Sequence, residues 1–317
     1  MNNEDRNTAA EVASNVNTEG AQASTIRRGD IYQEVTDRII QAMETAKASG
    51  VASLWDGAGE RAGLPLNHAT GKPYSGINVL ILWAAAGAHG YRSNRWLTYQ
   101  QTKSAGGQVR KGEHGTQCVF YKPIEAEEVN EAGETEIKRA AVLKSFTVFN
   151  LDQVDGIEAP DATTVRPVFE ARAEAERILK DSGARITEGG NQAYYQRATD
   201  SIRLPDRHRF HTPENFYATA LHELTHWTGH ESRLARTFGK RFGDEAYSME
   251  ELVAEIGAAF AIADLGMIHA TIEQHASYLD SWLRVLKSDK KAIFTAAAQA
   301  ARAHAYLMGR TAQAAAA

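Results

Sequence analysis

The stretch Leu221–Leu234, LHELTHWTGHESRL, includes the pattern HExxH, formed by His222, Glu223 and His226. On a helix, His222 and His226 are four residues apart and share one face, so both imidazoles can bind a single metal ion. Glu223 is placed to act on a metal-bound water molecule rather than on the metal itself. The apolar residues from Phe216 onward predict a half-buried helix. The stretch therefore predicts a catalytic zinc site, in which manganese or cobalt could replace zinc.

A catalytic zinc site needs a third protein ligand and keeps one position for water. The longer pattern HExxHxxGxxH fails, because Gly229 matches but Ser232 stands where its last histidine is required. His230 is one alternative ligand, although Gly229 is expected to end the helix just before it. Further along the chain, Glu250 and Glu251 are adjacent acids on another predicted helix. The spacing alone leaves all three candidates open.

The second of these helices, YSMEELVAEIGAAFAIADLG, resembles the ligand-bearing helix of the thermolysin-type glutamate zincins. The resemblance implies that Glu251 is the third zinc ligand. It also implies that Glu255, four residues later, hydrogen-bonds a zinc-bound histidine and fixes its orientation. Gly257 and the alanines around it would let another helix approach closely.

A zinc ion with an open position predicts peptide hydrolysis, with Glu223 taking a proton from water and passing it to the leaving amine. A peptide substrate needs a strand edge to align with, and the predicted hairpin at 193–204 is the candidate. The group that stabilises the tetrahedral oxyanion is open among Tyr194, Tyr195 and Tyr247.

Glycines and prolines divide the rest of the chain into helices and strands. Apolar spacing predicts helices at 31–48 and 77–86, and short β-branched and aromatic runs predict strands within 106–123 and 140–154. The acidic segment 124–139 between them predicts a solvated hairpin loop. Thr212 and Pro213 are typical of a helix start, and the chain is expected to be mainly helical from there to its end.

These elements predict an α+β protein with two domains. A mixed α/β domain comes first, and a mainly helical, zincin-like metallopeptidase domain with a small β-sheet follows it. The expected division is a disordered tail at 1–28, a first domain at 29–152, a linker at 153–166 and a second domain at 167–317.

Net charge, cysteine content and the length of apolar runs indicate the compartment in which the protein acts. The 317 residues carry a net charge of −5, which argues against a uniformly basic nucleic-acid-binding protein, so any such surface must be local. A single cysteine, Cys118, excludes an internal disulfide framework and fits a reducing compartment. No apolar run has the length of a membrane span, and the first residues lack the apolar core of a signal peptide. We therefore expect a cytoplasmic protein with no membrane contact.

The segment 90–122 is a local basic region, with six Lys or Arg residues against one acid and with aromatic residues interleaved. Stacking platforms combined with cations are what single-stranded nucleic acid requires. The alternative is that Trp96 and Tyr99 are core residues beneath an ordinary basic surface. The candidate DNA contacts are Arg92, Arg95, Trp96, Tyr99, Lys103, Arg110 and Lys111.

Four segments, TGKPYSGINVLILW, YRSNRWLTYQQ, GGQVRKGEHGTQCVFYK and FTVFNLDQVDGI, are followed in order by the HExxH half. In this order they resemble the ArdC-type plasmid antirestriction proteins, whose first module is shared with TraC-type plasmid primases. The resemblance covers about residues 31–307. It implies a single-stranded DNA-binding domain joined to a zinc metallopeptidase-like domain, and protection of incoming plasmid DNA from host restriction.

Three functional hypotheses remain at this stage. In the first, a DNA-associated metallopeptidase cleaves a restriction component or a DNA-bound protein. In the second, the protein shields DNA without proteolysis, and the metal only braces the fold. The third is a metallopeptidase without DNA affinity. Glu223 favours an enzymatic site, because a purely structural zinc site has no use for a water-activating glutamate.

Overall fold

The computed structural model describes residues 30–48, 63–129, 135–158, 168–239, 244–267 and 278–309. Contacts divide the chain into Met1–Asp30 and Ile31–Ala317, and the description below concerns the second unit. The predicted tail at 1–28, most of the predicted linker and the last eight residues lie outside the described part. Within the described residues, no helix is both long and apolar enough to cross a membrane.

The described residues of the first half form three helices and the beginning of a sheet, and the predicted helices at 31–48 and 77–86 are confirmed. Gly90, in the left-handed conformation at φ 67°, ends the second of them. The elements are α1 (Ile31–Ala48), β1 (Leu66–Asn67), α2 (Ile77–His89), β2 (Arg95–Thr98) and α3 (Tyr99–Ser104).

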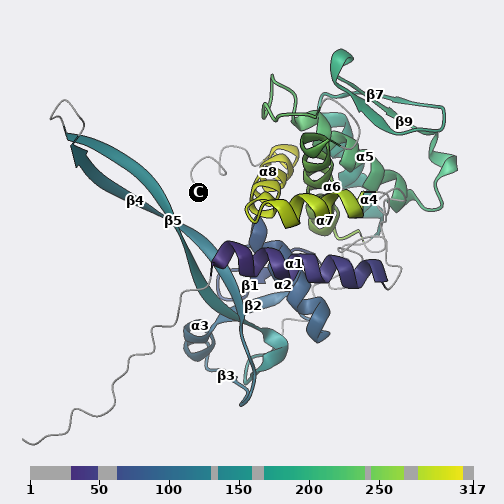
Figure 1. The fold of residues 1–317 in the computed structure, drawn as a ribbon. Coiled ribbons are helices and arrows are strands. Elements are labelled where there is room, and N and C mark those ends of the chain that lie inside the picture. The colour runs from purple at the N-terminus through teal and green to yellow at the C-terminus, as the bar shows by residue number, and fades with distance from the viewer. Residues whose placement is uncertain are drawn as a thin grey trace, which may run out of the picture. The chain divides into compact units, whose positions relative to one another are not determined.

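The main sheet has the strand order β1-β2-β5-β4, and its two longest strands form an antiparallel ribbon (Figure 1). The prediction of a loop over 124–139 is wrong for 124–129 and 135–139, which are paired strand; the residues between them lie outside the described part. Acidic composition without alternating apolar residues hid these strand ends from the sequence. The elements are β3 (Gln108–Val109), β4 (Thr116–Val129), β5 (Thr135–Asn150), the 3-10 turn η2 (Leu151–Gln153) and β6 (Val154–Asp155).

The second half begins with a helix and a small sheet of strand order β7-β9-β8. The predicted hairpin is confirmed: β8 runs antiparallel to β9, whereas β7 pairs with the other side of β9 in parallel. Strand β8 is therefore an edge strand. The elements are α4 (Val168–Asp181), β7 (Arg185–Glu188), β8 (Tyr194–Gln196), β9 (Ser201–Leu204) and the 3-10 turns η3 (Arg197–Thr199) and η4 (Arg207–Arg209).

The described residues from Pro213 onward are mainly helical, as predicted. Thr212 caps the first of these helices by accepting a hydrogen bond from the Asn215 amide, and proline occupies its first turn. Gly229 stands at its C-terminal end, so the helix stops directly before His230. The helices are α5 (Pro213–Thr228), α6 (Glu245–Leu265), α7 (Leu279–Ser288) and α8 (Ala292–Leu307).

Two large hydrophobic clusters hold these elements together. The first joins residues of α1, α2 and β4 to residues of α6, α7 and α8, so both predicted domains contribute to it. An edge-on contact between Trp83 and Phe260, with ring centroids 5.7 Å apart, lies within this cluster. The second cluster joins α4, β9, α5 and α6. Helices α5 and α6 thus pack against each other, and α5 carries the HExxH motif.

Candidate metal centre

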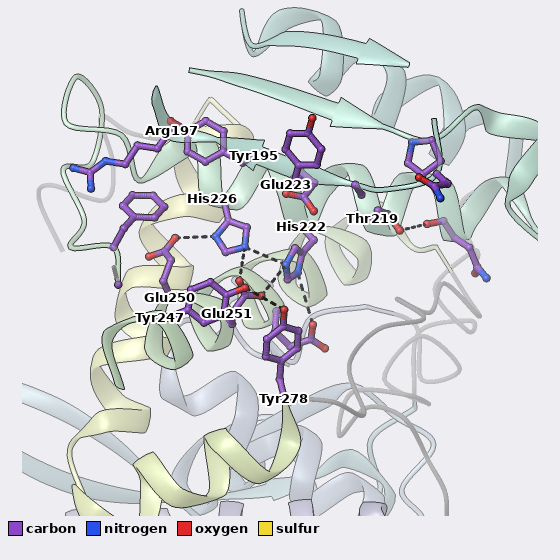
Figure 2. Close-up of a pocket in the computed structure, with 18 of the residues that line it drawn as sticks. Tyr195, Arg197, Thr219, His222, Glu223, His226, Tyr247, Glu250, Glu251 and Tyr278 are labelled. Carbon is purple, nitrogen blue, oxygen red and sulfur yellow. Dashed lines mark hydrogen bonds and ion pairs between the residues drawn. The ribbon is translucent and has the colours of Figure 1, made fainter. Parts of the chain in front are cut away.

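Helices α5 and α6 approach closely beside the motif, as the small residues of α6 predict. A Cβ atom built on Gly257 would lie 2.6 Å from the Thr225 Cγ2 atom, so only glycine fits at this contact. His222 and His226 lie one turn apart on α5, and Glu251 lies on α6. The close packing of the two helices brings the three side chains to one point (Figure 2).

The three groups offer ligand atoms at distances that one ion can span. The Nε2 atoms of His222 and His226 are 3.2 Å apart. Each Nε2 atom is 3.6 Å from one carboxylate oxygen of Glu251. All three side chains are nearly buried, and one ligand atom from each lies within 4.8 Å of the others. Two imidazole nitrogens and one carboxylate oxygen are a donor set that fits zinc and related divalent ions.

The other two ligand candidates are placed elsewhere. Glu250 points to the outer side of His226, with its Oε1 atom 3.1 Å from Nδ1. His230 Nδ1 is 2.8 Å from the Ser232 hydroxyl, outside the ligand group formed by the described residues. Glu251 is therefore the acid whose position suits a third ligand. The adjacent Glu250 instead hydrogen-bonds the histidine from behind.

A residue that the sequence analysis missed completes this arrangement. The buried Arg236 guanidinium donates to both carboxylate oxygens of Glu250, at 3.0 Å from Nε and 2.7 Å from Nη2. It also donates to the Thr228 hydroxyl at 2.8 Å. Arg236, Glu250 and His226 thus form one hydrogen-bonded series. No sequence motif predicts this series, because Arg236 lies in an irregular segment and contacts Glu250 only in the folded protein.

Glu255 faces the outer nitrogen of the other histidine. Its Oε2 atom is 3.9 Å from His222 Nδ1, and its side chain is buried. This is the side on which the thermolysin-type resemblance places an orienting carboxylate. Each imidazole therefore has a carboxylate near its Nδ1 atom, while its Nε2 atom faces Glu251.

Glu223 lines the same cavity but does not belong to the ligand group. The backbone N–H of Tyr195 on β8 donates a hydrogen bond to its carboxylate. Burial is the largest influence on the Glu223 carboxyl and raises its pKa above the usual value. The motif's glutamate is thus held between the edge strand and the histidines (Figure 2).

Charge in the site favours a cation between the carboxylates. Burial by itself would lower the pKa of His226, but the carboxylates of Glu250 and Glu251 raise it to about 10. Burial would raise the pKa of Glu251, but the two histidines bring it below the usual value. The surroundings therefore stabilise positive charge at the place where the ligand atoms converge. A divalent ion can supply that charge in place of a proton.

The cavity around these groups has a volume of about 440 Å³. Its aromatic lining includes the three tyrosines considered for the oxyanion. Tyr195 donates to the Asp200 carboxylate at 2.9 Å, and Tyr194 is 45% exposed. The Tyr247 hydroxyl is 3.1 Å from that of Tyr278 and also hydrogen-bonds Glu251. Of the three candidates, Tyr247 is therefore the one that contacts a residue of the ligand group.

Among the candidate DNA contacts, Trp96 is a correction. Its side chain is only 1% exposed and packs edge-on against Tyr91 within the first hydrophobic cluster, so it cannot stack on a base. Tyr99 is 49% exposed, and the Lys103 ammonium lies 5.8 Å from its ring centre. Of the two aromatic candidates, only Tyr99 is therefore available on the surface.

The basic candidates for DNA contacts differ in whether they form ion pairs within the protein. Arg110 donates to Glu113 at 2.9 Å and lies 3.6 Å from Asp155, so it stabilises the turn that follows β3. Lys111 and Arg92 are exposed, and Arg95 is half-buried. The structure therefore favours Lys111 and Arg92 over Arg110 as free surface cations.

Comparison with known proteins agrees with this geometry. Residues 173–299 match the family of zincin-like metallopeptidase domains, which carries the candidate metal centre. Residues 29–149 match the family described as the N-terminal domain of anti-restriction factor ArdC. The chain thus has a two-domain layout with a zincin-like second domain. The finer domain boundaries given above stay a prediction.

The chain belongs to the ArdC-type antirestriction family. It is similar to the metal-free crystal structure of the antirestriction protein ArdC from plasmid R388, with a TM-score of 0.72, 41% identity, and coverage of 90% of this chain and 98% of that one. The Mn(II)-bound structure of the same protein matches with a TM-score of 0.70, 39% identity, and coverage of 89% of this chain and 98% of that one.

Two kinds of sequence relative support the same assignment. An uncharacterized protein, y4eC of Sinorhizobium fredii, is 41% identical over 86% of this chain and 89% of its own length. The DNA primase TraC of Escherichia coli is 38% identical over 87% of this chain, which spans only 20% of that protein. A second TraC sequence from Escherichia coli is 38% identical over 87% of this chain, and the match covers 27% of that protein.

Proposed function

We propose that this protein is an antirestriction factor that binds single-stranded DNA and hydrolyses a peptide bond at a divalent metal ion. The observation that carries the enzymatic part is the division of labour in the HExxH motif. His222 and His226 converge with Glu251, whereas Glu223 lines the same cavity outside the ligand group. A structural metal site has no need for such a glutamate.

The proposed ligands are His222, His226 and Glu251, with zinc as the resident ion. A bound divalent ion would polarise a substrate carbonyl and make a water molecule more acidic. Manganese would replace zinc at the same ligands, since a related ArdC protein has been crystallised with Mn(II). Imidazole and carboxylate donors accept both ions.

The protein's own residues would carry the protons and hold the substrate. Glu223 would accept the proton of the attacking water and transfer it to the leaving amine. The Tyr247 hydroxyl, beside Glu251, is the proposed donor to the tetrahedral oxyanion. Edge strand β8 would pair with the substrate backbone, since Tyr194 and Tyr195 line the cavity.

The DNA-binding part of the proposal rests on surface chemistry of the first half. Exposed Tyr99, with Lys103 beside it, offers a stacking face next to a cation. Lys111 and Arg92 are exposed cations nearby in the chain. Membership in a family with the ArdC N-terminal domain and similarity to a primase agree with a DNA partner. We place this activity in the cytoplasm, where a free thiol such as that of Cys118 stays reduced.

Glu223→Gln tests the enzymatic part, because glutamine keeps the shape of the side chain but cannot act as a base. We expect the variant to keep its metal content and melting temperature and to lose all cleavage of a peptide library. In a plasmid-transfer assay at matched expression, we expect it also to lose protection against restriction. His230→Gln is the matched control, since it alters the neighbouring turn outside the ligand group.

Full protection by Glu223→Gln would overturn the link between peptidase chemistry and antirestriction. The protein would then act by shielding DNA, and the metal would brace the packing of α5 against α6. Cleavage without any affinity for oligonucleotides would instead indicate a metallopeptidase that does not bind DNA.

A further inference from the structure

Two arginines that line the cavity have no acidic partner in the part of the chain that the structure describes. They are Arg197 in η3 and Arg209 in η4, and both side chains are exposed. Two neighbouring arginines do have acidic partners. Arg207 pairs with Glu176 and Glu188, and Arg233 pairs with Asp200. The charges of Arg197 and Arg209 are therefore available to a bound molecule.

Arg197 is held beside the histidine at one end of the site. Its guanidinium carbon lies 5.1 Å from the centre of the Phe238 ring. The same ring is 6.1 Å from the Tyr195 ring and 6.5 Å from the His226 ring. A cation stacked on this aromatic side chain keeps its place without an acidic neighbour. Arg197 is thus positioned directly after β8, on the His226 side of the cavity.

Arg209 belongs to the opposite end of α5. It precedes Phe210, which packs edge-on against Phe216 at 5.4 Å in the first turn of the helix. Thr219, one turn before His222, also lines this part of the cavity. Figure 2 shows Thr219 and Arg197 on opposite sides of the histidine pair. The cavity therefore has one free arginine toward each end and the ligand group between them.

The acids at the centre do not neutralise these arginines. Glu250 is paired with Arg236 and His226, and Glu251 faces the two histidines. Positive charge toward both ends attracts acidic groups there, whereas the central acids already have partners of their own. A nucleic-acid strand carries a phosphate at every nucleotide and would bring charges to the centre as well. A peptide can place its acids at the two ends alone.

We propose that the cavity selects an extended peptide with acidic side chains on both sides of the scissile bond. This proposal rests on the proposed peptidase function and names its substrate class. A peptide that pairs antiparallel with β8 would have its N-terminal part beside Arg197. Tyr195, whose backbone hydrogen-bonds Glu223, precedes Arg197 by two residues, which corresponds to a distance of about 7 Å along a strand. An acid two or three positions before the scissile bond would thus reach Arg197, and Arg209 would meet an acid after it.

Binding of fluorescent peptides to the metal-loaded Glu223→Gln protein tests this preference without turnover. Matched peptides would carry Glu or Gln before the bond, after it, or at both places. We expect the Glu peptides to bind about fivefold more tightly for each arginine engaged, the upper range for exposed ion pairs. Arg197→Glu should abolish the preference before the bond and favour Lys there. Arg209→Glu should do the same after the bond.

Arg185→Glu is the matched control, because this exposed arginine lies on the same small sheet but not among the cavity-lining residues. It should leave both preferences unchanged. Equal affinity for Glu and Gln peptides, or equal loss with Arg185→Glu, would overturn the proposal. Tighter binding of a single-stranded oligonucleotide than of acidic peptides, lost with Arg197→Glu, would assign the arginines to nucleic acid instead. Acid-selective binding without cleavage by the wild type would refute only the peptidase function.

Discussion

Arg236→Met should lower the free energy of unfolding, because Arg236 is the buried partner of Glu250. Methionine has about the length of arginine but carries no charge, so Glu250 stays buried without its guanidinium partner. Burial alone would raise the pKa of Glu250, and hydrogen bonds from His226 and Arg236 bring it below the usual value. Breaking a buried ion pair by removing one partner costs about 3–5 kcal/mol. We expect about 3 kcal/mol, because His226 can still hydrogen-bond Glu250.

The double variant Arg236→Met/Glu250→Leu should recover most of that loss, because no buried charge is left unpaired. Its metal affinity should nevertheless fall about 10–100-fold, since His226 loses the carboxylate that orients its ring. Urea unfolding of the metal-free proteins measures the first effect, and competition with a chelator measures the second. Arg207→Met is the control, because its exposed ion pairs are worth at most about 1 kcal/mol.

Two results would refute this reasoning. A single variant within about 1 kcal/mol of wild type would show that the series from Arg236 to His226 does not hold the site together. A double variant with wild-type metal affinity would show that Glu250 has no part in orienting the ligand.

Trp96→Ala should lower the free energy of unfolding by about 3–5 kcal/mol in urea titrations, because the side chain is buried, whereas Tyr99→Ala should leave stability nearly unchanged and weaken oligonucleotide binding. Gly257→Ala should destabilise the protein and loosen metal binding, and an added Thr225→Ser, which removes the clashing methyl group, should reverse both effects. The hydrogen bond from Arg233 lowers the pKa of Asp200 below 3.8, so the pair stabilises the fold above about pH 4. The difference in free energy of unfolding between wild type and Asp200→Asn should therefore shrink as the pH falls below about 4. A difference independent of pH would contradict a stabilising ion pair between Asp200 and Arg233.

The sequence was most informative where structure depends on near neighbours. The positions of His222 and His226 on one face follow from helical spacing, and Thr212 marks the start of that helix through its own hydroxyl. The hairpin of β8 and β9 was also predicted from the sequence, with Pro205 ending its second strand. The acidic extension of β4 and β5 was not, because two paired strands without an alternating apolar pattern carry no such local signal.

Only tertiary structure decided which groups meet at the site. Adjacent residues on a helix point about 100° apart, so the rotation of α6 against α5 determines that Glu251 faces the ligand nitrogens and Glu250 the outer side of His226. The burial of Trp96 and the pairing of Arg236 likewise depend on segments distant in the chain. Periodicity along the sequence specifies the faces of each element. The packing of one element on another specifies which faces come together, because that choice depends on long-range contacts that no local pattern contains.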